Sequence, residues 1–177
     1  MATRWIAIAL SVSIAPAALA EDKAPRPGPE TEKLGFFAGK WKTSGELKET
    51  PFMPAGKFEG RETCEWFPGK FALVCRMKGK GPTGPTEGLG IMTWSGDEKA
   101  YLYYGIDNTP MVPTTLPRGT LAGDTWTYED ESRMGGQMVK SRYVIVVTGK
   151  KSYRSSWSIL GSDGQWKTVM EGTAIRQ

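Results

Sequence analysis

The sequence contains no histidine, and this absence excludes several kinds of functional site. A Ser-His-Asp or Cys-His catalytic system needs an imidazole, as does a histidine general base. A haem held by histidine and a zinc site that uses histidine are excluded for the same reason. Cysteine is scarce, since only Cys64 and Cys75 are present. We therefore expect no metal site and no cofactor, and the sequence has no recognisable catalytic constellation that would favour an enzyme.

A strong excess of one charge and long hydrophobic runs are also missing. The 23 lysines and arginines exceed the 19 acidic residues only slightly, and a net charge of +4 is too mild to indicate nucleic-acid binding. No apolar run approaches the ~20 residues that a membrane-spanning helix requires, so we expect no stable membrane anchor. Turn-forming residues are plentiful instead, with 22 glycines and 12 prolines.

The N-terminus has the pattern of a secretory signal peptide. Arg4 supplies a positive charge, Trp5–Ala15 is apolar, and Ala18-Leu19-Ala20 is a small-x-small cleavage site. The alternative is a membrane anchor, but the apolar run is short and Pro16 interrupts it. We predict cleavage after Ala20 and therefore an exported protein, either periplasmic or secreted.

Composition divides the chain into three parts. Residues 1–20 form the predicted signal peptide. Residues 21–33 contain three prolines and no large apolar side chain, so we expect a disordered leader there. Residues 34–177 show no repeat and no second change in composition, and we predict a single folded domain over this range.

The predicted domain is all-β. Leu34–Ala38 is a candidate for one short helical turn, but beyond it apolar and polar residues alternate with period two in about ten segments. These segments are 41–48, 58–66, 71–78, 89–94, 100–106, 120–122, 125–130, 138–148, 152–160 and 166–176. Most are joined by hairpin-length turns, so neighbours in sequence are expected to pair antiparallel. Closure into an up-and-down barrel would protect the edges, with a sandwich as the alternative.

The final segment, 166–176, alternates imperfectly. Met170 and Ala174 share one face, whereas Val169 points to the other face beside Lys167. A one-residue bulge would reconcile the two halves of this strand.

Cys64 and Cys75 lie on the two arms of a predicted hairpin. If Phe67 pairs with Ala72 across the turn, the two cysteines fall directly opposite each other at a non-hydrogen-bonded pair, where side chains are closest. That position suits a disulfide, and an exported protein meets an oxidising compartment. The alternative is a pair of buried thiols.

Two residues at the ends of the domain resemble a family signature. A Gly-x-Trp at Gly39–Trp41 opens the first strand, and the last strand ends with Arg176. This combination resembles the calycin signature of lipocalins and fatty-acid-binding barrels. The whole domain is similar to an uncharacterised bacterial group, the domain of unknown function family 1579. The resemblance implies a lipocalin-like barrel in which Arg176 packs across Trp41 and closes one end, and it implies no reaction.

A barrel of about ten strands encloses more space than one layer of side chains fills, so we expect an internal cavity. The residues predicted to line it and bind a ligand are Glu62, Trp66, Met92, Trp94, Tyr101, Tyr103, Arg142, Tyr153 and Trp157. We expect Arg142 and the tyrosine hydroxyls to orient a carboxylate or carbonyl, and the proline-rich segment Asp107–Pro117 to gate the opening.

Three functions fit this interpretation. The favoured one is a binding protein that holds a small apolar or amphipathic molecule, and a uniformly apolar cavity would favour it. A filled interior with an exposed apolar patch on the loops would favour a module that binds or inhibits a protein through its loops. A carboxylate of raised pKa beside tyrosine and arginine would favour an enzyme.

Overall fold

The computed structural model describes residues 25–109 and 115–177, so the predicted signal peptide lies outside the described residues. Two short helical segments, α1 (Pro29–Lys33) and the 3₁₀ turn η1 (Leu34–Phe37), precede ten strands. The strands are β1 (Gly39–Leu47), β2 (Gly56–Trp66), β3 (Ala72–Gly81), β4 (Gly84–Ser95), β5 (Ala100–Asp107), β6 (Arg118–Ala122), β7 (Thr125–Met134), β8 (Gln137–Gly149), β9 (Ser152–Leu160) and β10 (Trp166–Arg176). The expected all-β chain is confirmed.

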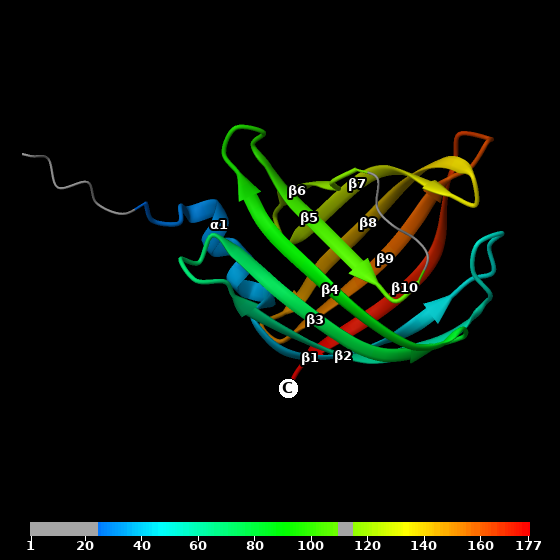
Figure 1. Ribbon diagram of the computed structural model, residues 1–177, viewed down its shortest axis with the longest axis horizontal. Helices are drawn as coiled ribbons and strands as arrows, with labels where there is room; N and C mark the ends of the chain where they lie inside the picture. The colour runs from blue at the N-terminus through cyan, green and yellow to red at the C-terminus, as the bar shows by residue number, and fades with distance from the viewer. Residues whose placement is uncertain (1–24, 110–114) are drawn as a thin grey trace, which may run out of the picture.

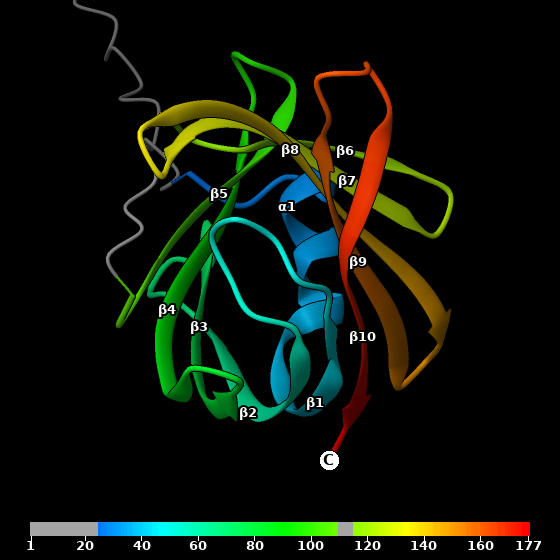
Figure 2. The same cartoon turned by 90° about the vertical axis from the view of Figure 1, so that its right-hand side faces the viewer.

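The ten strands form one closed, antiparallel, up-and-down barrel. Each strand pairs with its neighbours in sequence, and β1 closes the barrel by pairing with β10. Figure 1 shows the barrel from the side, and Figure 2 shows it turned by 90°. The barrel prediction is therefore confirmed, and the sandwich is excluded.

The seam between β1 and β10 is built around two glycines. Gly45 pairs with Gly172, and the ring of Phe58 lies over both. A Cβ at Gly45 would lie 2.1 Å from the Glu171 carbonyl oxygen and 2.6 Å from the Phe58 ring. Only glycine fits at position 45, because any Cβ there would collide with this backbone oxygen and with the ring.

The irregular last strand contains the expected bulge. The register of β10 against β9 shifts between Thr168 and Met170. Val169 is thereby buried at 5% exposure, while Met170 lines the barrel interior. The extra residue shifts the alternation, so Val169 is buried and Met170, the next residue, still faces the interior.

The helical segments close one end of the barrel, where Figure 1 places α1. Thr31 and Leu34 are buried, with 4% and 0% exposure. The expected disordered leader is therefore wrong for Pro29–Lys33. This helix is too short to show a periodic pattern, although a proline at its start and a lysine in its last turn are helix signals. No helix in the described ranges is long and apolar enough to cross a membrane.

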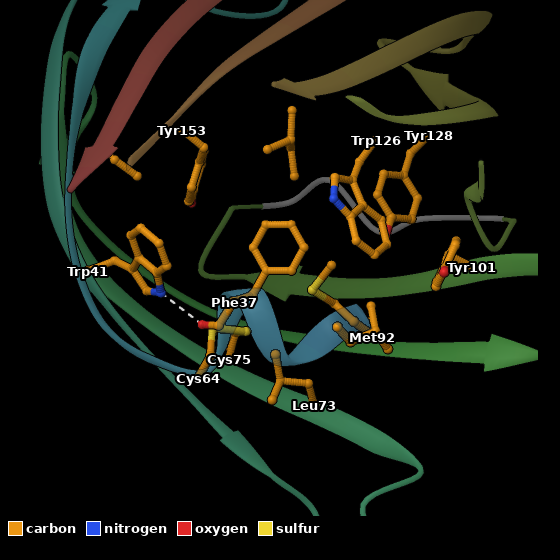
Figure 3. Packing of buried hydrophobic residues seen from close by; sticks show 13 residues of the cluster. Phe37, Trp41, Cys64, Leu73, Cys75, Met92, Tyr101, Trp126, Tyr128 and Tyr153 are labelled. Carbon is orange, nitrogen blue, oxygen red and sulfur yellow. Dashed lines mark hydrogen bonds between the residues drawn. A yellow bond between two sulfur atoms is a disulfide. The ribbon is translucent and has the colours of Figure 1, made fainter. Parts of the chain in front are cut away.

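The core occupies the closed half of the barrel. Phe37 projects from η1 towards Trp126, and Trp41 and Tyr153 lie beside it (Figure 3). The indole N–H of Trp41 donates a hydrogen bond of 2.8 Å to the Phe37 carbonyl. The guanidinium of Arg176 lies over the Trp41 ring, so the contact that the family resemblance implied is present.

Candidate functional site

A cavity of about 410 Å³ lies inside the barrel, between η1 and the open end. Its apolar lining comes from aromatic rings, aliphatic side chains and a disulfide: Phe37, Cys64, Cys75, Met92, Pro117, Ile145, Trp157 and Met170. Its polar lining comes from tyrosines, acidic groups and one serine: Glu62, Tyr103, Asp107, Tyr128, Asp130, Ser141, Tyr143 and Tyr153. A concave hollow whose wall combines aromatic and aliphatic side chains with convergent polar groups is typical of small-molecule sites.

The disulfide lies in the wall of this cavity. Cys64 and Cys75 are bonded and lie opposite each other on β2 and β3, with their Cα atoms 4.0 Å apart. Phe67 donates a backbone hydrogen bond to Ala72, which sets the expected register. A Glu62 oxygen lies within 4.8 Å of both sulfurs. Because both sulfurs are oxidised, this group of three residues offers a metal no thiolate ligand.

Glu62 is the most deeply placed carboxyl group in the cavity. It keeps part of its surface open to the hollow while protein surrounds it on the other sides. This burial raises the pKa of Glu62, and a hydrogen bond donated by the Tyr153 hydroxyl opposes the shift only partly. The result is a carboxyl group that holds its proton to a higher pH than an ordinary glutamate.

Three tyrosines that line the same cavity interact with Glu62. Burial raises the pKa of Tyr103, Tyr143 and Tyr153, and the negative charge of Glu62 raises each further. These phenols therefore stay protonated and can donate hydrogen bonds. The Tyr128 hydroxyl is buried without a hydrogen-bond partner within the described part of the chain. A buried hydroxyl without a partner is costly, so it marks a position where a ligand or water can bond.

Two further carboxylates lie nearer the open end. Asp130 on β7 accepts a hydrogen bond of 2.6 Å from the Ser141 hydroxyl. Asp107 ends β5 and accepts 2.5 Å and 2.8 Å bonds from the side chain and backbone of Thr109. Together with Glu62, these groups put three acidic side chains around one cavity.

The structure divides the nine predicted lining residues into three groups. Five line the cavity: Glu62, Met92, Tyr103, Tyr153 and Trp157. Three lie outside its lining, towards the closed end: Trp66, Trp94 and Tyr101. The ninth, Arg142, is on the outer face. The prediction of a hollow interior is therefore supported. The cavity is shallower than expected, because three of the predicted residues are packed at the closed end, and it lacks the expected arginine.

Trp66, Trp94 and Tyr101 belong to the packed closed end. The ring of Trp66 lies 3.6 Å from where a Cβ at Gly35 of η1 would be. The Tyr101 ring packs at a tilt against Trp94, with the ring centroids 4.8 Å apart, and its hydroxyl donates a hydrogen bond of 2.7 Å to Glu30 of α1. The helical segments thus cover these side chains, which the sequence placed in an open interior.

The prediction that Arg142 points inward is wrong. Its guanidinium is 2.7 Å from Glu129 and lies over the Trp166 ring, 4.1 Å from the centroid. In β8 the cavity takes Ser141, Tyr143 and Ile145, so alternation directs Arg142 outwards. The expected arginine for a ligand carboxylate is therefore absent from this cavity.

Tyr143, Tyr128 and Phe37 were missed for identifiable reasons. Placing Arg142 inside put Tyr143 on the wrong face of the same strand. Tyr128 lies two residues after Trp126 in β7 and shares its buried face, so period-two alternation was a usable signal for it. No local pattern predicts that Phe37 lines the cavity, because its position depends on how η1 enters the barrel. The predicted gate Asp107–Pro117 lies partly outside the described residues, although both its ends line the cavity.

A second hollow, of about 800 Å³, lies on the outside of the barrel across the β1–β10 seam. Exposed charged side chains such as Lys57, Glu59, Lys80 and Arg154 surround it. It is the larger of the two, but water already solvates these groups. We therefore take the interior cavity as the candidate site.

Comparison with known proteins supports the fold. A family model described as a protein of unknown function, DUF1579, matches residues 26–176, so the chain belongs to this family. No curated protein matches the chain. Among solved structures, the S-type phycobiliprotein lyase CPES of Guillardia theta has a TM-score of 0.57 at 10% identity, over 82% of this chain and 91% of the lyase. Rv2717c of M. tuberculosis has a TM-score of 0.59 at 12% identity, over 85% and 98% of the two chains.

Proposed function

We propose that this DUF1579 barrel binds one small, apolar or amphipathic molecule in its interior cavity. The observation that carries the proposal is the cavity itself: about 410 Å³, walled largely by aromatic rings, with tyrosine and carboxyl groups in its lining. Burying a ligand's apolar surface there releases about 25 cal/mol per Å². The hydroxyls of Tyr103 and Tyr128 and the Glu62 carboxyl supply the directional contacts.

The structural neighbours support the architecture on which this proposal depends. The lyase and Rv2717c share the barrel with this chain at 10% and 12% identity. Similarity at this level shows a common fold and carries no information about the ligand of this chain. The ligand argument therefore rests on this chain's own residues. The cavity does not meet one of the two conditions of the protein-interaction alternative, which were a filled interior and an exposed apolar patch on the loops.

Binding can be tested by the fluorescence of the tryptophans in the cavity wall and in the core beneath it. We expect saturable quenching of tryptophan fluorescence by small apolar compounds, since Trp157 lines the cavity. Met170→Phe fills space beside Trp157 and should weaken binding, whereas Ile175→Phe, on the exposed outer face, should not. Native mass spectrometry of protein from its own host should find a retained molecule. Absence of both signals would refute the proposal.

We further propose that the protein is exported. The supporting observations are the disulfide and the signal-peptide pattern of residues 1–20. N-terminal sequencing of exported material should start at Glu21. Exported material that still begins with Met1 would contradict the proposal.

Acid–base catalysis is a second candidate, because Glu62 has a raised pKa and a hydrogen bond to Tyr153. A carboxyl group whose pKa is raised in this way keeps its proton more readily and can pass it to a bound ligand. The arginine that this alternative also required lies on the outer face. Turnover of a retained ligand by the parent protein but not by Glu62→Gln would favour catalysis over simple binding.

A further inference from the structure

The charged side chains in the cavity lining are all acidic. Among the residues that the structure describes, no lysine or arginine lines the cavity beside them. Glu62, Asp107 and Asp130 line the cavity from β2, β5 and β7. The protein as a whole carries a net charge of +4, so its overall composition does not explain an acidic interior.

Strand alternation keeps the positive charges outside. Wall residues that are exposed include Arg61, Arg76, Lys78, Arg133, Lys140 and Arg154. Arg176 lies at the closed end, where its guanidinium is over Trp41 and donates a hydrogen bond to the Phe36 carbonyl. It is engaged there and is not part of the cavity lining.

Aromatic rings occupy much of the wall between the carboxyl groups. Tyr103 and Tyr128 lie 6.2 Å apart in an edge-to-face arrangement, and Trp157 faces the same hollow. The faces of such rings are electron-rich and attract organic cations, and cages of several rings bind quaternary ammonium groups. The aromatic rings and the carboxylates therefore both favour a positively charged ligand.

An independent sign of a missing partner comes from Tyr128. Its side chain is 4% exposed, it lines the cavity, and its hydroxyl lacks a hydrogen-bond partner among the described residues. This hydroxyl can accept a hydrogen bond from an ammonium N–H or donate one to a ligand oxygen.

We propose that the ligand is an organic cation, an amine or quaternary ammonium group attached to an apolar body. The inference rests on the proposed function, since it names the ligand class of the same cavity. The cationic group lies between Glu62, Asp130 and the tyrosine rings, and the apolar body packs against Met92, Ile145 and Trp157. A carboxylate ligand would instead face three acidic groups without a counter-ion, an arrangement that opposes binding.

Binding of a cation is coupled to a proton on Glu62. The titratable groups that interact with Glu62 are Tyr103, Tyr143 and Tyr153, and Asp107 and Asp130 line the same cavity. Its strand neighbours, Trp41 and Met77, do not titrate. A cation near Glu62 favours the ionised form, so binding releases a proton where Glu62 is protonated, and affinity rises with pH.

The test uses three probes with one apolar body: 4-phenylbutylamine, 4-phenylbutan-1-ol and 4-phenylbutanoate. Calorimetric titration at low salt should give an affinity for the amine about tenfold above that for the alcohol, with the carboxylate weakest. Glu62→Gln should remove most of the amine's advantage over the alcohol, because it removes the negative charge and keeps the shape of the side chain. Asp130→Asn provides a second variant of this kind. The matched control is Glu65→Gln, on the exposed face of the same strand.

The outcomes separate the two proposals. Equal binding of all three probes, or preference for the carboxylate, overturns the cationic ligand while cavity binding stands. An amine preference that survives in both Glu62→Gln and Asp130→Asn also overturns it. If none of the three probes binds saturably, the proposed binding function of the cavity and the proposed ligand class are both overturned. Proton release should appear as a binding enthalpy that differs between phosphate and Tris buffers for the amine only.

Discussion

The guanidinium of Arg176 lies 4.7 Å from the ring centroid of Trp41, across the seam where the last strand pairs with the first. Each of these side chains also holds the segment that closes the barrel. Trp41 donates a hydrogen bond to the Phe37 carbonyl, and Arg176 donates one to the Phe36 carbonyl. The pair therefore joins barrel closure to the position of Phe37, which lines the cavity.

Replacing Arg176 with methionine should destabilise the protein. The change removes the cation–π contact and leaves the Phe36 carbonyl without its side-chain donor, so we expect a loss of about 1–3 kcal/mol in the free energy of unfolding. Urea denaturation measures this loss. Arg154→Met, on the exposed outer face of β9, is the matched control and should change stability by less than about 0.5 kcal/mol. Equal effects of the two substitutions would contradict the structural role of Arg176.

Glu62→Gln should stabilise the empty protein at neutral pH. Burial raises the pKa of Glu62 in the folded state, so the folded protein binds more protons than the unfolded chain, and stability falls as pH rises above about 4.5. Glutamine removes this pH-dependent loss and can still accept the Tyr153 hydrogen bond. Thermal unfolding across pH 3–8 should show a higher Tm for the variant above pH 4.5, with the difference disappearing at lower pH. A constant difference across the range would contradict the burial of this charge.

The disulfide should contribute measurably to stability. It connects residues 11 apart in sequence, and a loop of this size corresponds to a stabilisation of roughly 2–3 kcal/mol. Denaturation of the Cys64→Ala/Cys75→Ala double variant measures the contribution. The denatured, unreduced parent protein should give no free thiol with a thiol reagent. Two reactive thiols in that sample would show that the bond is absent.

Deleting α1 should weaken the closed end. Thr31 is buried, and Glu30 accepts the Tyr101 hydroxyl, so a chain that begins at Leu34 loses contacts that a chain beginning at Pro25 keeps. We expect the shorter chain to have a Tm lower by at least ~3 °C, the equivalent of about 1 kcal/mol for a domain of this size. Calorimetry of the two chains measures the difference. Identical Tm values would restore Leu34 as the domain boundary.

Much of the fold follows from local sequence patterns. Period-two alternation and the turn residues between segments predicted ten antiparallel strands, and the broken alternation around Val169 predicted the bulge in β10. The hairpin register placed Cys64 opposite Cys75, because a short turn fixes which residues pair. These features depend on residues close together in the chain, so the sequence by itself determined them.

The cavity's polarity and depth were decided by the tertiary structure. Alternation shows that Arg142 and Tyr143 lie on opposite faces, but only closure of the whole sheet sets which face is inside, and it directs Arg142 outwards. The five residues of α1 are too few for a periodic signal, so their burial depends on contacts with distant strands. By closing one end, this segment leaves Trp66 and Tyr101 packed in the core and Glu62 facing the hollow, because a side chain's place along a barrel depends on what fills the barrel's ends.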